Sequence, residues 1–474
     1  MSLNNKFSLK EISVFIFLFT IIFQTGFAQN DSSKRVLFRV NDIFIIGNSI
    51  TKNSIILREL TFTKGSTIDS INLQQQLQRS KENIYNTSLF NSVEVNYFSF
   101  GDNEIKVTIF LKERWYLLPN PIFEIHERNF NVWWDESEKL HRVVIGGYLI
   151  YNNFRGRNET LSLAIKEDYF QRYDLKYDIP YINKKQQFGI GFSIGYNTNH
   201  EIIDNLVNNQ LVYFLDDNFF ALKEYYAEAR ITKRDGLYNT QTLYLDYKND
   251  QINDTIVALN KDYFLNSRTN EQYVSISYLF EQDYRDIKIY PLKGYYFNFN
   301  FQQLGFVQKD LNISYIRASY KKFWELSDQF YFETGIDGRF SIQKSQPFFM
   351  QSALGWGTEY VRGYELYVIN GQNYGLLKTE FKWQLFYPQV FHVPYFSWEK
   401  FNSIPIALYL TAFGDLGYAQ DQLYANGNPL ANTLLPGGGM GLDFVTYYNI
   451  VWRFEYSINK MGQRGFYVHF AAPI

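Results

Sequence analysis

The sequence contains no cysteine among its 474 residues. Disulfide bonds, thiolate metal sites and cysteine nucleophiles are therefore excluded together. Basic residues are not in excess either, because the formal net charge is −2 and the pI is near 6.3. This balance gives no indication of a nucleic-acid partner. The five histidines are scattered without ligand spacing, so the sequence predicts no metal site and no cofactor.

Long apolar runs are missing after residue 28. Before that point, two lysines precede an apolar run over residues 12–23, and small residues end at Ala28. This pattern is typical of a signal peptide over residues 1–28 that is removed after Ala28. The alternative is a membrane anchor, but the run is shorter than the roughly 20 residues that a spanning helix needs. Gln29 follows the predicted cleavage site, which does not indicate lipid attachment.

Aromatic residues are abundant. The chain has 39 tyrosines, 44 phenylalanines and 8 tryptophans, 19% of all residues, yet its mean hydropathy is only −0.29. A transmembrane β-barrel accounts for both values, because every second strand residue faces lipid and aromatic girdles mark the two interfaces. The alternate residues face a wet lumen. The composition therefore favours a barrel in the bacterial outer membrane, with outer-membrane lipids as one partner.

A period of two in hydropathy runs from about residue 140 to the C-terminus. Between residues 374 and 387, largely apolar odd positions alternate with polar residues such as Lys378, Glu380 and Lys382, which places Glu380 on the wet face. The pattern predicts an all-β barrel of about 16 antiparallel strands over 142–474, closed because unpaired edges are costly in lipid. The candidate strands lie near 142–152, 158–167, 171–178, 187–197, 206–215, 221–232, 237–248, 271–282, 293–303, 310–323, 328–342, 374–387, 404–416, 434–444, 447–457 and 464–470.

The N-terminal part has a different pattern. Residues 36–114 predict a small α+β domain of order β-α-α-β-β, which is just large enough to bury a core. Its place after the signal peptide predicts a periplasmic location. Residues 115–141 are expected to be a connector, and residues 343–373 a large functional loop. The expected elements are strands near 38–47, 93–97 and 105–111, and helices near 54–60 and 73–85.

Several short motifs carry a resemblance to a known family. Residues 45–48 (IIGN), 58–60 (REL) and 89–93 (LFNSV) resemble a polypeptide-transport-associated (POTRA) domain. The loop contains Val361-Arg362-Gly363-Tyr364-Glu365, which is similar to the VRG(F/Y) signature of the BamA/TamA superfamily of outer-membrane assembly and translocation barrels, the bacterial surface antigen family. The resemblance runs from about residue 38 to the C-terminus. It departs from the best-known members in having one POTRA domain, which argues against the role of main essential insertase.

The resemblance implies a loop folded into the barrel and held through Arg362. In the family, acids on the inner wall hold this arginine, and Glu380 and Asp415 stand at the matching positions. A guanidinium between carboxylates is a physically sound anchor for a loop. The alternative is a solvated loop arginine.

No enzymatic activity is predicted. A Ser-His-acid triad would need a nucleophile beside a histidine, and the sequence indicates no candidate nucleophile for His392 or His469. The glycines of residues 436–441 lack the Lys-Ser or Lys-Thr of a phosphate-binding loop, so they are expected to relieve crowding or permit a bend.

The leading hypothesis is insertion of nascent outer-membrane proteins or translocation of a polypeptide. The POTRA domain would offer a sheet edge to an unfolded outer-membrane or secreted polypeptide. The barrel would open between its first strand, Val143 to Tyr151, and its last, Phe466 to Phe470. Accessory lipoproteins and other subunits of an outer-membrane complex are further candidate partners. A pore, a structural subunit and a dedicated two-partner-type secretion transporter remain open as alternatives.

Overall fold

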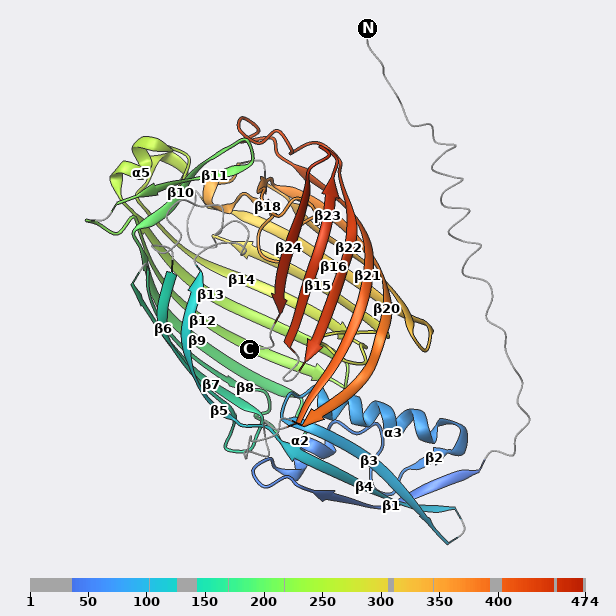
Figure 1. Cartoon of the computed structure of the whole chain (residues 1–474). Helices are drawn as coiled ribbons and strands as arrows, with labels where there is room; N and C mark the ends of the chain where they lie inside the picture. The colour runs from blue at the N-terminus through green and yellow to red at the C-terminus, as the bar shows by residue number, and fades with distance from the viewer. Residues whose placement is uncertain are drawn as a thin grey trace.

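The computed structural model describes residues 36–101, 103–125, 143–168, 170–216, 218–305, 311–343, 345–392, 403–446 and 450–471. The predicted signal peptide and residues 126–141 of the predicted connector lie outside the described residues. The described chain forms a small α+β domain at one end of a large curved sheet (Figure 1). None of the described helices has the length and apolar character needed to cross a membrane.

The N-terminal domain has a four-stranded sheet of order β2-β1-β4-β3, in which β1 and β4 run parallel. The predicted order β-α-α-β-β is confirmed, with the short strand β2 added before the second helix. The Asp69 side chain caps that helix by accepting a hydrogen bond from the Ile71 N–H at 3.1 Å. The elements are β1 (Leu37–Ile46), α2 (Asn53–Leu57), β2 (Thr67–Asp69), α3 (Ser70–Tyr85), β3 (Phe90–Phe100) and β4 (Glu104–Glu113).

The core of this domain follows from two periodicities. Leu73, Leu77 and Ile84 lie on one face of α3 and are buried. Ile105 and Val107, alternate residues of β4, are fully buried in the same cluster. Helix face and sheet face therefore meet in one small apolar core.

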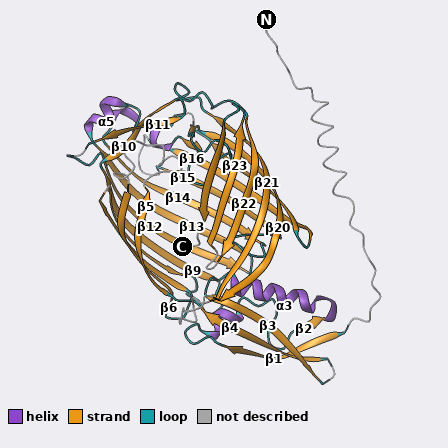
Figure 2. Cartoon of the chain, viewed as in Figure 1, coloured by secondary structure: helices purple, strands orange, loops and turns teal. Residues whose placement is uncertain are grey.

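The large sheet has sixteen strands, and each is antiparallel to its neighbours (Figure 2). The predicted all-β fold is confirmed. The strands in chain order are β5 (Leu117–Ile125), β6 (Val143–Phe154), β7 (Glu159–Asp168), β8 (Phe170–Ile179), β9 (Phe188–Asn199), β12 (Leu222–Asp235), β13 (Asn239–Ile252), β14 (Asn270–Asp283), β15 (Gly294–Leu304), β16 (Ile313–Ser327), β17 (Phe330–Ser341), β20 (Asn373–His392), β21 (Ser403–Gln420), β22 (Leu435–Thr446), β23 (Ile450–Asn459) and β24 (Arg464–Ala471).

One of the sixteen predicted strands is wrong, and one strand was missed. The segment near 206–215 is not in the large sheet, because β10 (Glu201–Val207) and β11 (Gln210–Leu215) form a separate hairpin. Asn208 and Asn209 turn this hairpin with positive φ of 51° and 61°, as a tight two-residue turn requires. The missed strand is β5, which lies in the predicted connector. Its two prolines interrupt the strand pattern in the sequence.

The predicted alternation of apolar and polar residues is present in the strands of the large sheet. On β20, Phe381 and Trp383 are exposed, whereas Glu380, Lys382 and Gln384 are buried. The polar face lines a cavity of about 1780 Å³ that is bordered by charged and hydroxyl-bearing side chains from many strands. An apolar outer surface around a polar interior suits a sheet surrounded by lipid.

The remaining elements cap the sheet at the end away from the α+β domain (Figure 1). An aromatic cluster around Tyr263, Phe264 and Phe348 joins the β10–β11 side of this cap to the long loop. The short elements are α5 (Asp254–Leu259), the 3₁₀ turns Leu265–Ser267 and Phe348–Met350, and the strands β18 (Ser352–Leu354) and β19 (Ile369–Asn370).

The two parts of the molecule are joined by an ion pair whose carboxylate is buried. The Nη1 and Nη2 atoms of Arg234, on β12, donate hydrogen bonds to the two carboxylate oxygens of Glu59 at 2.6 and 2.7 Å. Tyr181 accepts a further hydrogen bond from the same guanidinium at 2.7 Å. Glu59 is only 3% exposed. A bidentate pair of this kind fixes orientation as well as distance, so the small domain is held in one position under the sheet.

A second contact involves the turn after β6. The Asn153 amide donates a hydrogen bond to Thr51 Oγ1 at 2.8 Å, and the Lys52 N–H donates to the Gly156 carbonyl at 2.9 Å. Gly156 has φ +68°, and a side chain there would overlap the carbonyl of Ile50. The glycine in this turn is therefore required by close approach to the small domain.

Glu113 organises the same loop of the small domain. Its carboxylate accepts hydrogen bonds from Ser49 Oγ at 2.8 Å, the Thr51 N–H at 2.7 Å and Thr51 Oγ1 at 2.6 Å. Burial raises the pKa of Glu113, but these hydrogen bonds outweigh it and hold the pKa below its ordinary value of 4.5. The charged carboxylate therefore stabilises the loop at any pH above 4.5. This stabilisation is lost as the pH falls through the lowered pKa.

We expect Glu113→Gln to reduce amide protection of residues 49–51 at pH 7 by the equivalent of about 1 to 2 kcal/mol, after allowance for solvent screening. At a pH well below 4.5 the wild-type carboxyl is protonated too, so the two proteins should converge. Hydrogen exchange of the full chain in detergent at both pH values measures this. An equal difference at both pH values would show that the charge is not responsible.

Candidate functional site

The long loop folds back into the sheet and places its tip against the inner wall of β20 to β24. Leu354, Val361 and Tyr364 of the loop are buried together with Leu376 of β20 and Leu435 of β22. Strands β18 and β19 pair with each other, so the loop has its own small ladder. The tip is therefore packed against the wall, and the loop behind it is held by its own strand pair.

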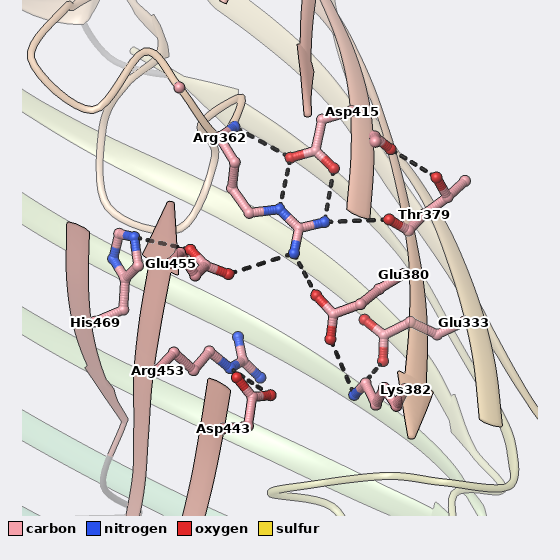
Figure 3. Close-up of polar contacts among 12 residues, drawn as sticks. Glu333, Arg362, Thr379, Glu380, Lys382, Asp415, Asp443, Arg453, Glu455 and His469 are labelled. Atoms are coloured by element: carbon pink, nitrogen blue, oxygen red, sulfur yellow. Dashed lines mark hydrogen bonds and ion pairs between the residues drawn. The ribbon is translucent and has the colours of Figure 1, made fainter. Parts of the chain in front are cut away.

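Arg362 is the centre of the site (Figure 3). It is 5% exposed, and its Nε and Nη2 atoms donate to the two carboxylate oxygens of Asp415 at 2.9 and 2.7 Å. Its Nη1 atom is hydrogen-bonded to Glu380. The guanidinium also lies 3.8 Å from the ring centroid of Phe413. All these contacts orient the planar group in one way.

Two more acidic side chains extend this arrangement into a network. Glu455, on β23, lies 3.5 Å from Arg362 Nη1. Glu333 and Glu380 are directly opposite on neighbouring strands β17 and β20, a repulsive arrangement that Lys382 relieves by contacting them at 2.7 and 3.5 Å. Removing one member of a buried ion network leaves the others unpaired, at a cost of about 3 to 5 kcal/mol.

The backbone of the tip is shaped by Gly363, which has φ +96°. Its N–H donates to Glu365 Oε2 at 2.8 Å, and its carbonyl accepts from the Asn459 amide at 2.9 Å. Tyr364 donates its hydroxyl to the carbonyl of Pro436 at 3.0 Å. Each of the five residues 361–365 thus has a defined place, and only the glycine can adopt the left-handed turn without strain.

Two glycines of the wall make room for the tip. A side chain at Gly437 of β22 would overlap the carbonyl oxygen of Arg362, and one at Gly417 of β21 would overlap Val361. Within the glycine-rich stretch 436–441, Gly437 therefore allows the backbone of the loop tip to approach β22 closely. The expectation that its glycines relieve crowding agrees with this position.

His469 of β24 completes the group of polar residues around the tip. Its Nε2 atom lies 3.2 Å from Glu455 Oε2 and 3.7 Å from Glu365 Oε1 (Figure 3 shows the first contact). Its ring stacks on Tyr360, with centroids 5.2 Å apart. The tip of the loop is thus in contact with the last strand of the sheet.

The edges of the large sheet are β5 and β24, and within the described residues these two strands are not paired. The expected closure by strand pairing is therefore not present in the described part of the chain. The predicted first strand of the seam is also wrong: Val143 and Tyr151 lie on β6, the second strand, because β5 precedes it. Phe466 and Phe470 lie on β24, as expected, and both side chains are exposed.

Prolines remove donors from the free edge of β5. The Asn152 N–H donates to the Tyr116 carbonyl at 2.8 Å, so residue 116 directs its backbone groups toward β6. The regular register of β5 on β6 means that alternate residues, including Pro119 and Pro121, face the opposite edge. A proline has no N–H. Two successive positions that would donate to an adjoining strand therefore cannot.

The structure brings Arg362 together with Glu380 and Asp415. Sequence reasoning missed Glu455, Lys382, Glu333 and His469 as members of the same network. The period of two already placed Glu455 and Lys382 among the alternate polar residues of their strands. It does not show which of many wet-face residues face the loop, because that depends on how far along each strand the tip lies.

A sixteen-stranded antiparallel sheet with an apolar outer surface and a polar lumen, preceded by a small α+β domain, defines the class of transmembrane β-barrels. Residues 153–408 match the Omp85 superfamily domain, and residues 38–114 match POTRA, described as surface antigen variable number repeat. The chain belongs to the Omp85 superfamily of outer-membrane barrels. The resemblance stated from the sequence motifs is confirmed.

Two solved structures share the fold. BamA from Haemophilus ducreyi lacking POTRA domains 1-3 is 14% identical, with a TM-score of 0.50, over 99% of this chain and 94% of that chain. CdiB from Escherichia coli is 12% identical, with a TM-score of 0.53, over 91% of this chain and 75% of that chain. At these identities the likeness concerns the fold alone. None of the curated proteins matches the chain.

The contact between Gly437 and the loop tip gives a direct test of the packing. We expect Gly437→Ala to displace the tip and to cost about 1 to 3 kcal/mol, because its Cβ would overlap the Arg362 carbonyl. Limited proteolysis of the loop in the folded barrel measures the displacement. Gly375→Ala on β20 is the control, since a Cβ there meets nothing within 4 Å. Equal protease resistance of both variants would contradict the close approach.

Proposed function

We propose that this protein inserts nascent outer-membrane proteins into the membrane or moves a polypeptide across it. The observation that carries the proposal is that, within the described residues, the edge strands β5 and β24 are not paired with each other and lie in a barrel of the Omp85 superfamily with an anchored loop tip. A free strand edge is a template on which another chain can pair. A nascent barrel strand is a chain of this kind, because it must satisfy its backbone groups before it meets lipid.

The edge of β5 is suited to reversible pairing. An edge strand with all its backbone N–H groups could pair with β24 and close the barrel. Pro119 and Pro121 lack this donor, so pairing between β5 and β24 would be incomplete. A client strand that pairs with β24 instead competes with a weak partner. This supports a lateral opening at β5 and β24 in place of the predicted opening at β6.

The POTRA domain supports the same function through its own exposed surface. Strand β3 is at the edge of the sheet, where Phe98 is 61% exposed and Phe100 is also exposed. Phe110 is exposed on the neighbouring strand β4, and Phe44 and Ile46 are exposed on β1, the next strand of the sheet. An extended polypeptide could add a strand to β3 and place apolar side chains on this surface. We place the domain in the periplasm, where such clients arrive.

We expect depletion of the protein to lower the levels of many other outer-membrane barrels, and Arg362→Ala to fail in restoring them. The alanine leaves Asp415, Glu380 and Glu455 without their shared cation, which releases the tip. Arg362→Lys should restore function only in part, because lysine keeps the charge but not the planar fork. Quantitative proteomics of outer membranes measures both variants.

The matched control is Arg172→Ala, which removes another arginine of the lumen, paired with Asp174 on β8. It should restore client levels as the wild type does. Heat-modifiability in electrophoresis shows that each variant barrel is folded. An unchanged proteome after depletion would favour a pore or a structural subunit, and the loss of a single extracellular product would favour a dedicated secretion transporter.

We expect the double variant Pro119→Val/Pro121→Val to close the seam, because it adds two N–H donors to the free edge of β5. One cysteine introduced in β5 and one in β24 report on closure by crosslinking, and the chain has no native cysteine to interfere. Crosslinking should rise and client insertion should fall. Leu118→Val is the control, since its N–H already faces β6. Crosslinking that is equal in both variants would refute the role of the prolines.

A further inference from the structure

Glu365, Glu455 and His469 come from three separate elements and meet at the tip of the loop. One ligand atom from each lies within 4.8 Å of the other two, and this is the group of potential metal ligands found among the described residues. From this geometry we propose that the three residues bind one divalent transition-metal ion of the zinc type. Imidazole nitrogen with two carboxylate oxygens is a donor set that such ions accept.

The two distances that involve His469 suit a tetrahedral site. Nε2 of His469 is 3.2 Å from Glu455 Oε2 and 3.7 Å from Glu365 Oε1. Ligand atoms about 2.0 to 2.2 Å from a tetrahedral zinc ion are about 3.4 Å apart. Neither Nε2 of His469 nor Oε2 of Glu455 forms a hydrogen bond of normal geometry within the described structure. The two atoms lie 3.2 Å apart without the geometry of a hydrogen bond, so both are available to a bound ion.

The histidine can be held in the required protonation state. Nδ1 of His469 is 3.4 Å from the Tyr360 hydroxyl oxygen. If Nδ1 carries the proton and donates it to that oxygen, Nε2 presents its lone pair toward the two carboxylates. Metal-binding histidines are commonly oriented in this way by a partner on the other ring nitrogen.

The charge around the site favours a cation. The ion pairs connected to the site hold five carboxylates and two permanent cations, and Lys378, over the ring of Tyr360, adds a third cation. With His469 neutral, the group has a net charge of −2. One divalent ion would neutralise it. The carboxylates are Glu333, Glu365, Glu380, Asp415 and Glu455, and the two cations are Arg362 and Lys382.

The ion would connect the loop to the edge of the sheet. Glu365 belongs to the tip, Glu455 to β23 and His469 to β24, the last strand. Arg362 holds the tip to β20 and β21, so the ion would add a second anchor on the other side. Binding would therefore restrain β24 itself, without requiring any particular client or transport function.

Full-length protein in detergent, stripped with a chelator and then titrated with Zn²⁺, tests the site. We expect one zinc per chain and a gain in protease resistance of residues 343–373 on binding. Glu365→Gln removes one anionic ligand but keeps an oxygen for the Gly363 N–H. It should weaken zinc binding at least about tenfold. His469→Asn should do the same.

His200→Asn is the matched control. Its ring contacts the carbonyls of Asp216 and Phe219 at 2.8 and 3.1 Å, in a different part of the chain, so zinc binding should be unchanged. If His469→Asn does not fold, Glu365→Gln still decides, because Glu365 is outside the sheet ladder. Zinc binding that is absent in the wild type, or equal in Glu365→Gln and the wild type, overturns the proposal.

Discussion

The rest of the site depends on the contact between one buried guanidinium and the carboxylates of the barrel wall. Arg362 cannot remain in the lumen wall without Asp415 and Glu380, and those acids cannot remain buried without a cation. This mutual requirement fixes the loop tip. Because the acids stand on different strands, the same contact also fixes the relative positions of β20 and β21. One side chain therefore couples a loop to the sheet around it.

The tip contacts two parts of the wall in different ways. On one side, β20 to β22 offer glycines and buried ion pairs that accept it closely. On the other side, β23 and β24 contact it through Glu455 and His469, at the edge of the sheet. A movement of β24 away from the loop would separate His469 from Glu365 and Tyr360, whereas a movement of β20 would separate Glu380 from Arg362. The tip is thus held to β20 and β21 through the buried ion pairs of Arg362, and to β24 through His469.

The small domain is positioned by the same kind of chemistry. A bidentate ion pair between Glu59 and Arg234 connects the α+β domain to the turn between β12 and β13, with Tyr181 as a third member. The exposed apolar surface of the domain and its free edge β3 are consequently presented in a fixed orientation. A client that binds there would approach the sheet from a defined direction, as the proposed function requires.

The sequence by itself determined the class of the fold. Strand periodicity and lipid-facing aromatics are local properties, so alternation alone identified fifteen strands of the sheet and the wet face of Glu380. The gap in the strand pattern indicated the loop, and the motif around Arg362 added by resemblance that it folds into the barrel and which acids hold it. Tertiary structure alone decided that β5 is the first strand, that Pro119 and Pro121 face the free edge, and that Glu365, Glu455 and His469 converge. The reason is that strand register and the depth of the loop are set by long-range contacts, which no local period encodes.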